Sequence, residues 1–209
     1  MNIIVVGAGF GGIASALRAR ALGHKVTLIE KNQSLGGRAQ VFQRDGYRHD
    51  AGPTVITAPF LFDELFELFG KKREDYVTFT PLKTWYRFVY DDLSHFDYSG
   101  EQEHIDQCIS KINTDDVENY QSLLSESKSI YEIGFQQLAD KPFHQLSQML
   151  KLLPDMLRLK SYRSVWQLVC SHIESEKLQQ AFSIQPLLVG GNPFDTTCIY
   201  NLIHFLERK

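Results

Sequence analysis

The chain has 209 residues, of which 43% are hydrophobic and 22% charged, and its formal net charge is −3. This length supplies one large domain or two small ones, and the composition excludes a disordered or fibrous chain. The slight acidic excess argues against a dedicated nucleic-acid-binding protein, which normally carries a basic surplus. Cys108, Cys170 and Cys198 lie too far apart for a disulfide framework or a paired-cysteine metal motif, so we expect buried thiols in a reducing compartment.

The apolar run from Ile3 to Leu17 is not expected to be an export signal or a membrane span. No Lys or Arg precedes it, and four glycines interrupt it. It is also shorter than the roughly 20 apolar residues that a membrane-spanning helix needs. We therefore expect a cytoplasmic protein, and contact with a membrane from the cytoplasmic side stays open.

The start of the chain predicts two parallel strands joined by a helix. Residues 3–6 are a short, fully apolar strand of the kind buried in a parallel sheet, and a glycine-rich turn follows over 7–12. An alanine-rich helix is expected over 13–22, ended by Gly23, with a second strand over 25–30. This βαβ unit predicts an α/β fold with a Rossmann-like core.

Two further elements are expected before the chain becomes helical. Extended segments are predicted over 39–50, and an amphipathic helix over 60–69 is stopped by Gly70. Alternating, aromatic-rich residues over 84–90 and 94–98 predict an antiparallel hairpin, although its turn has no glycine.

Beyond the hairpin we expect helices from Glu101 onward. Residues 101–127 carry an acidic excess, whereas 143–173 carry a basic one. The predicted organisation is therefore a nucleotide-binding part over 1–80 and a hairpin-plus-helices part over 81–209.

The glycine-rich turn has the spacing of a dinucleotide-binding motif. Gly7 permits a tight turn, Gly9 lets the backbone approach a pyrophosphate, and Gly12 lets the helix pack closely on the strand. The phosphates then lie at a helix N-terminus, which favours anions. Glu30, at the end of the second strand, can accept hydrogen bonds from a ribose and would repel a 2′-phosphate. Neighbouring candidates for the same site are Phe10, Gly11 and Lys31.

A second glycine pair distinguishes FAD from NAD. Gly36 and Gly37 bring another backbone stretch without side chains back toward the nucleotide. Arg38 beside them can pair with the pyrophosphate or lie against the flavin edge. The alternative is an ordinary turn with a solvated arginine.

Together these residues resemble the two-part fingerprint of the glutathione-reductase-like flavoproteins, which include amine oxidases and phytoene desaturases. Within that group, residues 50–57, 189–194 and 200–208 are similar to bacterial-type phytoene desaturases. The resemblance runs over essentially the whole chain and implies FAD as cofactor. The cofactor-binding residues that it implies are Gly7, Gly9, Phe10, Gly11, Gly12, Glu30, Lys31, Gly36, Gly37, Arg38, Pro53 and Thr54.

Members of that family are more than twice as long as this chain. The resemblance therefore implies an N-terminal portion with an incomplete fold: part of the FAD-binding domain over 1–80 and a partial substrate domain over 81–209. We expect this chain alone to be inactive.

The resemblance implies an FAD-dependent oxidoreductase of carotenoid biosynthesis that desaturates a long apolar polyene such as phytoene. The alternatives are a carotenoid isomerase or polyene saturase of the same flavoprotein family, or a non-catalytic FAD-binding fragment. A hydrocarbon substrate offers no polar handle, so an apolar tunnel and access from a membrane are expected.

Residues 145–169 carry the membrane hypothesis. Apolar residues recur there at helical spacing, and Pro154 must kink or divide the helix. Docking on an anionic membrane and packing in a protein core are both open interpretations of this pattern. The apolar residues are Leu146, Met149, Leu150, Leu153, Met156 and Leu157, and the interleaved cations are Lys151, Arg158, Lys160 and Arg163.

Other chemistry finds little support. The seven histidines form no pair at metal-ligand spacing, so no metal site is predicted. His49 and Asp50 are adjacent on an extended segment and therefore point to opposite sides. We interpret Asp50 as a structural residue near the flavin loop and assign no catalytic base.

Overall fold

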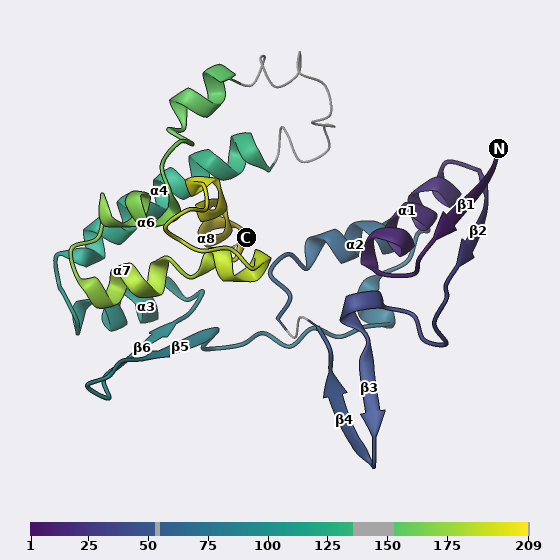
Figure 1. The fold of residues 1–209 in the computed structure, drawn as a ribbon, viewed down its shortest axis with the longest axis horizontal. Coiled ribbons are helices and arrows are strands. Elements are labelled where there is room, and N and C mark those ends of the chain that lie inside the picture. Colours follow the sequence, from purple (N-terminus) through teal and green to yellow (C-terminus); the bar gives the residue numbers. More distant parts are fainter. Residues whose placement is uncertain (53–54, 136–152, 209) are drawn as a thin grey trace. The chain divides into compact units, whose positions relative to one another are not determined.

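The structure is a computed structural model that describes residues 1–52, 55–135 and 153–208 (Figure 1). The chain divides into two compact units, Met1–Thr80 and Pro81–Lys209. The described strands form three two-stranded sheets, two in the first unit and one in the second.

The first unit begins with the predicted βαβ arrangement. Strands β1 (Asn2–Val6) and β2 (Lys25–Ile29) pair in parallel, and helix α1 (Phe10–Ala21) connects them (Figure 1). The expected helix start at Ile13 is wrong by three residues. Gly7, with φ of +99°, completes the reversal of the chain so early that it is already helical at Phe10.

Helix α1 covers only one face of the β1–β2 sheet. Val5 points toward α1, whereas Ile4 and Val6 on the other face are 67% and 82% exposed. In a doubly wound fold, helices cover both faces of the sheet. In this unit α1 covers one face, and the face that carries Ile4 and Val6 is exposed.

A hairpin and a helix complete the first unit. Strands β3 (Val41–Arg44) and β4 (Tyr47–Asp50) are antiparallel, and Asp45 and Gly46 between them both have positive φ. The sequence analysis expected extended segments here but missed their pairing, which an Asp-Gly turn signals. Helix α2 (Phe60–Glu67) confirms the amphipathic helix before Gly70, whose φ is +65°.

The second unit opens with the predicted hairpin of β5 (Tyr86–Val89) and β6 (His95–Tyr98), with Phe88 opposite Phe96. Its turn works without glycine, because the Asp92 carboxylate accepts hydrogen bonds from the backbone and hydroxyl of Ser94.

Helices make up the rest of the second unit and enclose an aromatic core. Tyr98, Tyr120 and Phe182 are fully buried, and the rings of Tyr120 and Phe182 stack 4.6 Å apart. The helices are α3 (Gln102–Ser110), α4 (Asp116–Gly134), residues 153–158, α6 (Val165–Cys170), α7 (Glu176–Phe182) and α8 (Leu202–Leu206), with 3₁₀ turns at Gln185–Val189 and Cys198–Asn201.

The region behind the membrane hypothesis is only partly described. Residues 145–152, and with them Leu146, Met149, Leu150 and Lys151, lie outside the described residues. Within the described ranges, no helix is both long and apolar enough to cross a bilayer.

Candidate dinucleotide-binding site

The turn between β1 and α1 leads into a helix N-terminus without a side-chain cap, which is a position that favours anions. The N–H of Gly7 donates to Ile29 O at 2.7 Å, which ties the turn to the end of β2. Gly9 caps α1 with an extended backbone and supplies no side-chain hydrogen bond. The first N–H groups of an α-helix have no intrahelical acceptor, and the positive end of the helix dipole lies there.

Gly12 is required by close packing. A Cβ built on Gly12 would lie 1.9 Å from Gly7 O and 3.7 Å from Val5 Cγ1, so any side chain would push the helix off the turn. The same construction on Gly11 meets nothing within 4 Å. There is therefore space for a side chain at Gly11 but not at Gly12.

Glu30 lies beside the turn. The N–H of Ala8 donates to Glu30 Oε2 at 2.7 Å, and the N–H of Asn32 donates to Oε1 at 2.9 Å. These two bonds, that of Ala8 first, lower the pKa of Glu30 below its ordinary value. An ionised acceptor is thus held next to the glycine-rich turn.

The second glycine pair, Gly36 and Gly37, lies against the turn between β1 and α1. Gly36 N–H donates to Ala8 O at 2.8 Å, and Gly36 forms a parallel bridge with Gly9. A Cβ on Gly37 would lie 3.1 Å from Gly9 Cα, and both glycines of the pair have positive φ. The two backbones therefore approach as closely as they do because neither carries a side chain there.

A third stretch packs on the second. A Cβ on Gly52 would lie 2.1 Å from Arg38 O, and the N–H of Ala51 donates to Gln40 O at 3.0 Å. Gly52 was not among the predicted site residues, although it stands in the stretch over 50–57 that carries the family resemblance. Ala8 was also missed, because an alanine inside a glycine motif gives no signal of its own.

The remaining predicted residues are less constrained. Arg38 and Lys31 are exposed. Phe10 is 50% exposed, and its ring meets that of Phe62 edge-on at 5.6 Å. Pro53 and Thr54 lie outside the described residues.

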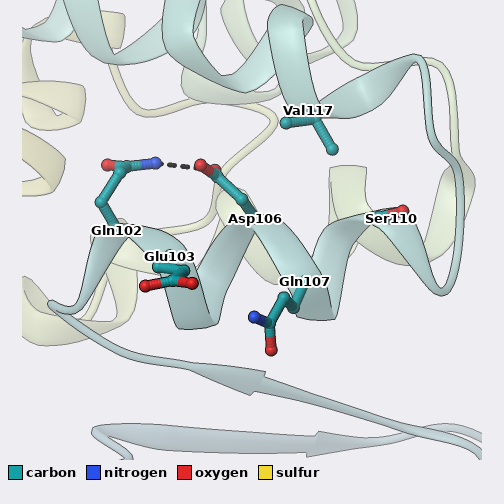
Figure 2. A pocket seen from close by; sticks show the side chains of 6 residues that line it. All are labelled: Gln102, Glu103, Asp106, Gln107, Ser110 and Val117. Atoms are coloured by element: carbon teal, nitrogen blue, oxygen red, sulfur yellow. Dashed lines mark hydrogen bonds between the residues drawn. The ribbon is translucent and has the colours of Figure 1, made fainter.

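The second unit has a shallow surface hollow of about 600 Å³ along α3, which Figure 2 shows from close by. Gln102 Nε2 donates to Asp106 Oδ1 at 2.7 Å across its rim. Five of its six lining residues carry an amide, carboxylate or hydroxyl group. Its lining residues are Gln102, Glu103, Asp106, Gln107, Ser110 and Val117.

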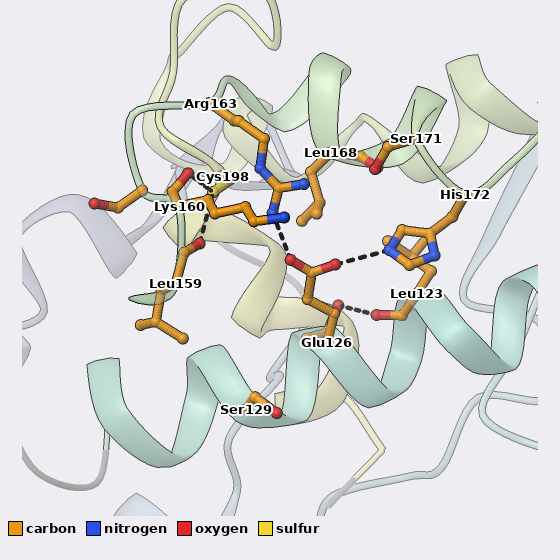
Figure 3. Close-up of polar contacts among 12 residues, drawn as sticks. Leu123, Glu126, Ser129, Leu159, Lys160, Arg163, Leu168, Ser171, His172 and Cys198 are labelled. Atoms are coloured by element: carbon orange, nitrogen blue, oxygen red, sulfur yellow. Dashed lines mark hydrogen bonds and ion pairs between the residues drawn. The ribbon is translucent and has the colours of Figure 1, made fainter. Parts of the chain in front are cut away.

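A charged cluster in the second unit changes the interpretation of one predicted membrane cation. Glu126 on α4 accepts a hydrogen bond from His172 Nε2 at 2.8 Å through one oxygen and pairs with Arg163 through the other (Figure 3). His172 first, then Arg163, lowers the pKa of Glu126 below its ordinary value. Because the Arg163 side chain is only 16% exposed, it is a structural ion-pair residue rather than a surface cation.

No group of three or more His, Cys, Asp or Glu side chains in the described ranges could hold a metal ion. The three cysteines are unpaired, and only Cys198 is fully buried.

Comparison with known proteins first defines the class. Residues 5–71 match the family model for NAD(P)-binding Rossmann-like domains. A solved triple mutant of putrescine oxidase, made for redesign of cofactor binding, aligns with a TM-score of 0.60 over 96% of this chain and 40% of that chain, at 17% identity. The chain therefore has an α/β fold with a Rossmann-like core, as predicted.

Curated relatives then show which proteins the whole chain is similar to. A lycopene-forming phytoene desaturase from Pantoea ananas is 44% identical over 98% of this chain and 42% of its own length. A neurosporene-forming phytoene desaturase from Cereibacter sphaeroides is 32% identical over 99% of this chain and 40% of its own length. The chain is thus homologous to phytoene desaturases along its whole length, which confirms the predicted resemblance, and it spans about two fifths of the length of these relatives.

Proposed function

We propose that this chain binds FAD and belongs to an oxidoreductase that desaturates a carotenoid precursor such as phytoene. The observation that carries the proposal is the close approach of the second glycine pair to the turn at the start of α1, with a third backbone stretch packed on that pair's neighbours. A Cβ on Gly37 would lie 3.1 Å from Gly9 Cα, and a Cβ on Gly52 would collide with Arg38 O at 2.1 Å. The phytoene desaturases to which the chain is similar supply the proposed substrate class.

Each part of the proposed site has one task. Glu30 accepts hydrogen bonds from the hydroxyls of the adenosine ribose, and the backbone N–H groups in the first turn of α1, after Gly9, bind the diphosphate. Arg38 supplies a cation next to Gly36 and Gly37. Bound FAD would supply the two-electron oxidation of a C–C bond, while the residues of this chain bind and orient the cofactor.

FAD titration of the purified chain tests this assignment. We expect a yellow complex that survives desalting, and FMN should bind at least about tenfold more weakly because it lacks the adenosine that Glu30 and the diphosphate site recognise. A folded chain that takes up no FAD would overturn the proposal.

We propose in addition that the protein is cytoplasmic and contacts an anionic membrane surface through the segment 153–160. Leu153, Met156 and Leu157 are 48%, 40% and 59% exposed, and Arg158 and Lys160 are exposed beside them. Exposed apolar side chains with adjacent cations suit the interface of an anionic bilayer.

Sedimentation with vesicles tests the membrane proposal. We expect the double variant Arg158→Glu/Lys160→Glu to lose binding to vesicles that contain anionic lipid, because each cation near such a surface contributes about 1 kcal/mol. The control variant Lys83→Glu/Lys111→Glu makes the same charge change at two other exposed lysines of the second unit. Equal loss in both variants would show that only net charge matters and would contradict a docking segment.

A further inference from the structure

We infer that Glu30 is also a positioning residue: its carboxylate holds the glycine-rich turn in its binding shape before any cofactor arrives. This inference rests on the proposed FAD site. It concerns the contact of Glu30 with Ala8, which is separate from the contact with a ribose.

Ala8 is the residue on which the predicted motifs converge. It is fully buried, and both of its backbone groups are engaged, its N–H by Glu30 Oε2 at 2.7 Å and its C=O by the N–H of Gly36 at 2.8 Å. The first of these bonds is short and charge-assisted, and such bonds are about twice as strong as neutral ones. Ala8 thus joins the turn to the end of β2 and to the second glycine pair.

Both oxygens of Glu30 are already placed by the protein. Oε1 accepts the N–H of Asn32 at 2.9 Å while Oε2 accepts that of Ala8. A carboxylate oxygen can accept a second hydrogen bond, so ribose hydroxyls can add to these contacts without displacing them. Binding a ribose and holding the turn are therefore compatible roles.

Loss of the carboxylate would leave a buried donor without a partner. The N–H of Ala8 lies in the fully buried part of the turn, and an unsatisfied buried N–H is costly enough to make the backbone rearrange. Gly9 follows directly and caps α1, so the change would reach the amides that receive the diphosphate. Phosphate binding should then weaken even for a ligand without ribose hydroxyls.

Four binding measurements separate the two roles. The wild-type chain and Glu30→Ala are each titrated with ADP and with 2′,3′-dideoxy-ADP, which keeps the diphosphate but offers no ribose hydroxyl. If Glu30 acted only by binding the ribose hydroxyls, Glu30→Ala would not change the affinity for dideoxy-ADP. We expect instead that Glu30→Ala weakens dideoxy-ADP binding by about fivefold, because the turn is no longer held.

Two variants show whether the loss is local. Glu30→Gln keeps an amide oxygen that can accept the N–H of Ala8, so it should restore part of the dideoxy-ADP affinity. Glu67→Ala removes an exposed acid on α2 of the same unit and should change neither affinity.

Hydrogen exchange without ligand gives a second readout. We expect amides over 7–12 to exchange about fivefold faster in Glu30→Ala, while those of α3 keep the wild-type rate. Unchanged exchange over 7–12, or equal dideoxy-ADP affinity in wild type and Glu30→Ala, overturns the positioning role. Failure of wild type to bind ADP or FAD would instead remove the proposed function, and the exchange rates alone would then decide the inference.

Discussion

At the scale of single residues, Gly11 and Gly12 stand side by side in the first turn of α1 but face different surroundings. A Cβ on Gly12 would collide with Gly7 O, whereas a Cβ on Gly11 meets open space. Gly11 has no positive φ, so alanine can take its conformation without strain.

We therefore predict opposite outcomes for two neighbouring substitutions. Gly12→Ala should lower the free energy of unfolding by about 1–3 kcal/mol, because the turn and the helix must move apart. Gly11→Ala should be neutral or stabilising by up to about 1 kcal/mol, because alanine favours the helix. Urea unfolding of the two variants checks this, and equal destabilisation by both would contradict the packing role assigned to Gly12.

At the scale of elements, a buried carboxylate joins two helices of the second unit. Asp116 in the first turn of α4 is fully buried. It accepts the backbone N–H groups of Glu174 and Ser175, at the start of α7, at 2.8 and 2.9 Å. The side-chain amides of Asn113 and Asn119 donate to it at 3.1 and 3.0 Å. One side chain thus satisfies donors from α4, from the two residues directly before α7 and from the loop before α4.

Asp116→Ala should lower the free energy of unfolding by about 3 kcal/mol, because four part-buried donors lose their acceptor. Asp116→Asn keeps one acceptor oxygen and should cost less. The matched control is Asp115→Ala: Asp115 is exposed and makes no capping hydrogen bond, so its loss should stay within about 0.5 kcal/mol. Chemical denaturation measures all three, and similar losses at both positions would refute the linking role of Asp116.

At the scale of the whole molecule, two titrating groups of the second unit shape the pH dependence of stability in opposite directions. His204 is fully buried, and burial lowers its pKa from 6.5 to about 3. The stability that goes with neutral His204 is complete above pH 6.5 and is lost as the pH falls toward 3. Burial raises the pKa of Glu207 from 4.5 to about 7, so its contribution is complete below 4.5 and is lost as the pH rises to 7.

The variant Glu207→Gln isolates the second effect. The free energy of unfolding of the variant minus that of the wild type should increase by about 2 kcal/mol from mildly acidic to mildly alkaline pH. The reason is that only the wild type must keep a desolvated carboxylate charged at the higher pH. The difference should be constant above the folded pKa of about 7. Urea unfolding of both proteins across this range measures it, and a difference that does not change with pH would contradict a raised pKa at Glu207.

Local patterns in the chain predicted most of its local structure, although they missed the pairing of β3 with β4. The apolar strands, the glycine spacing and Glu30 predicted the βαβ unit, and aromatic alternation predicted the β5–β6 hairpin. The start of α1 was misplaced because Gly11 and Gly12 read as turn residues, although the chain is helical from Phe10. Periodicity and turn chemistry act over a few residues, which is why they predict elements better than element boundaries.

The sequence by itself determined a Rossmann-like βαβ unit with an acid after its second strand, because these features depend on residues close together in the chain. Only the tertiary structure decided that Gly36 and Glu30 both bind the backbone of Ala8. It also decided that Arg163 pairs with Glu126 instead of facing outward as a surface cation. Such contacts join residues that are far apart in sequence, so they follow from how whole elements pack and not from any local pattern of side chains.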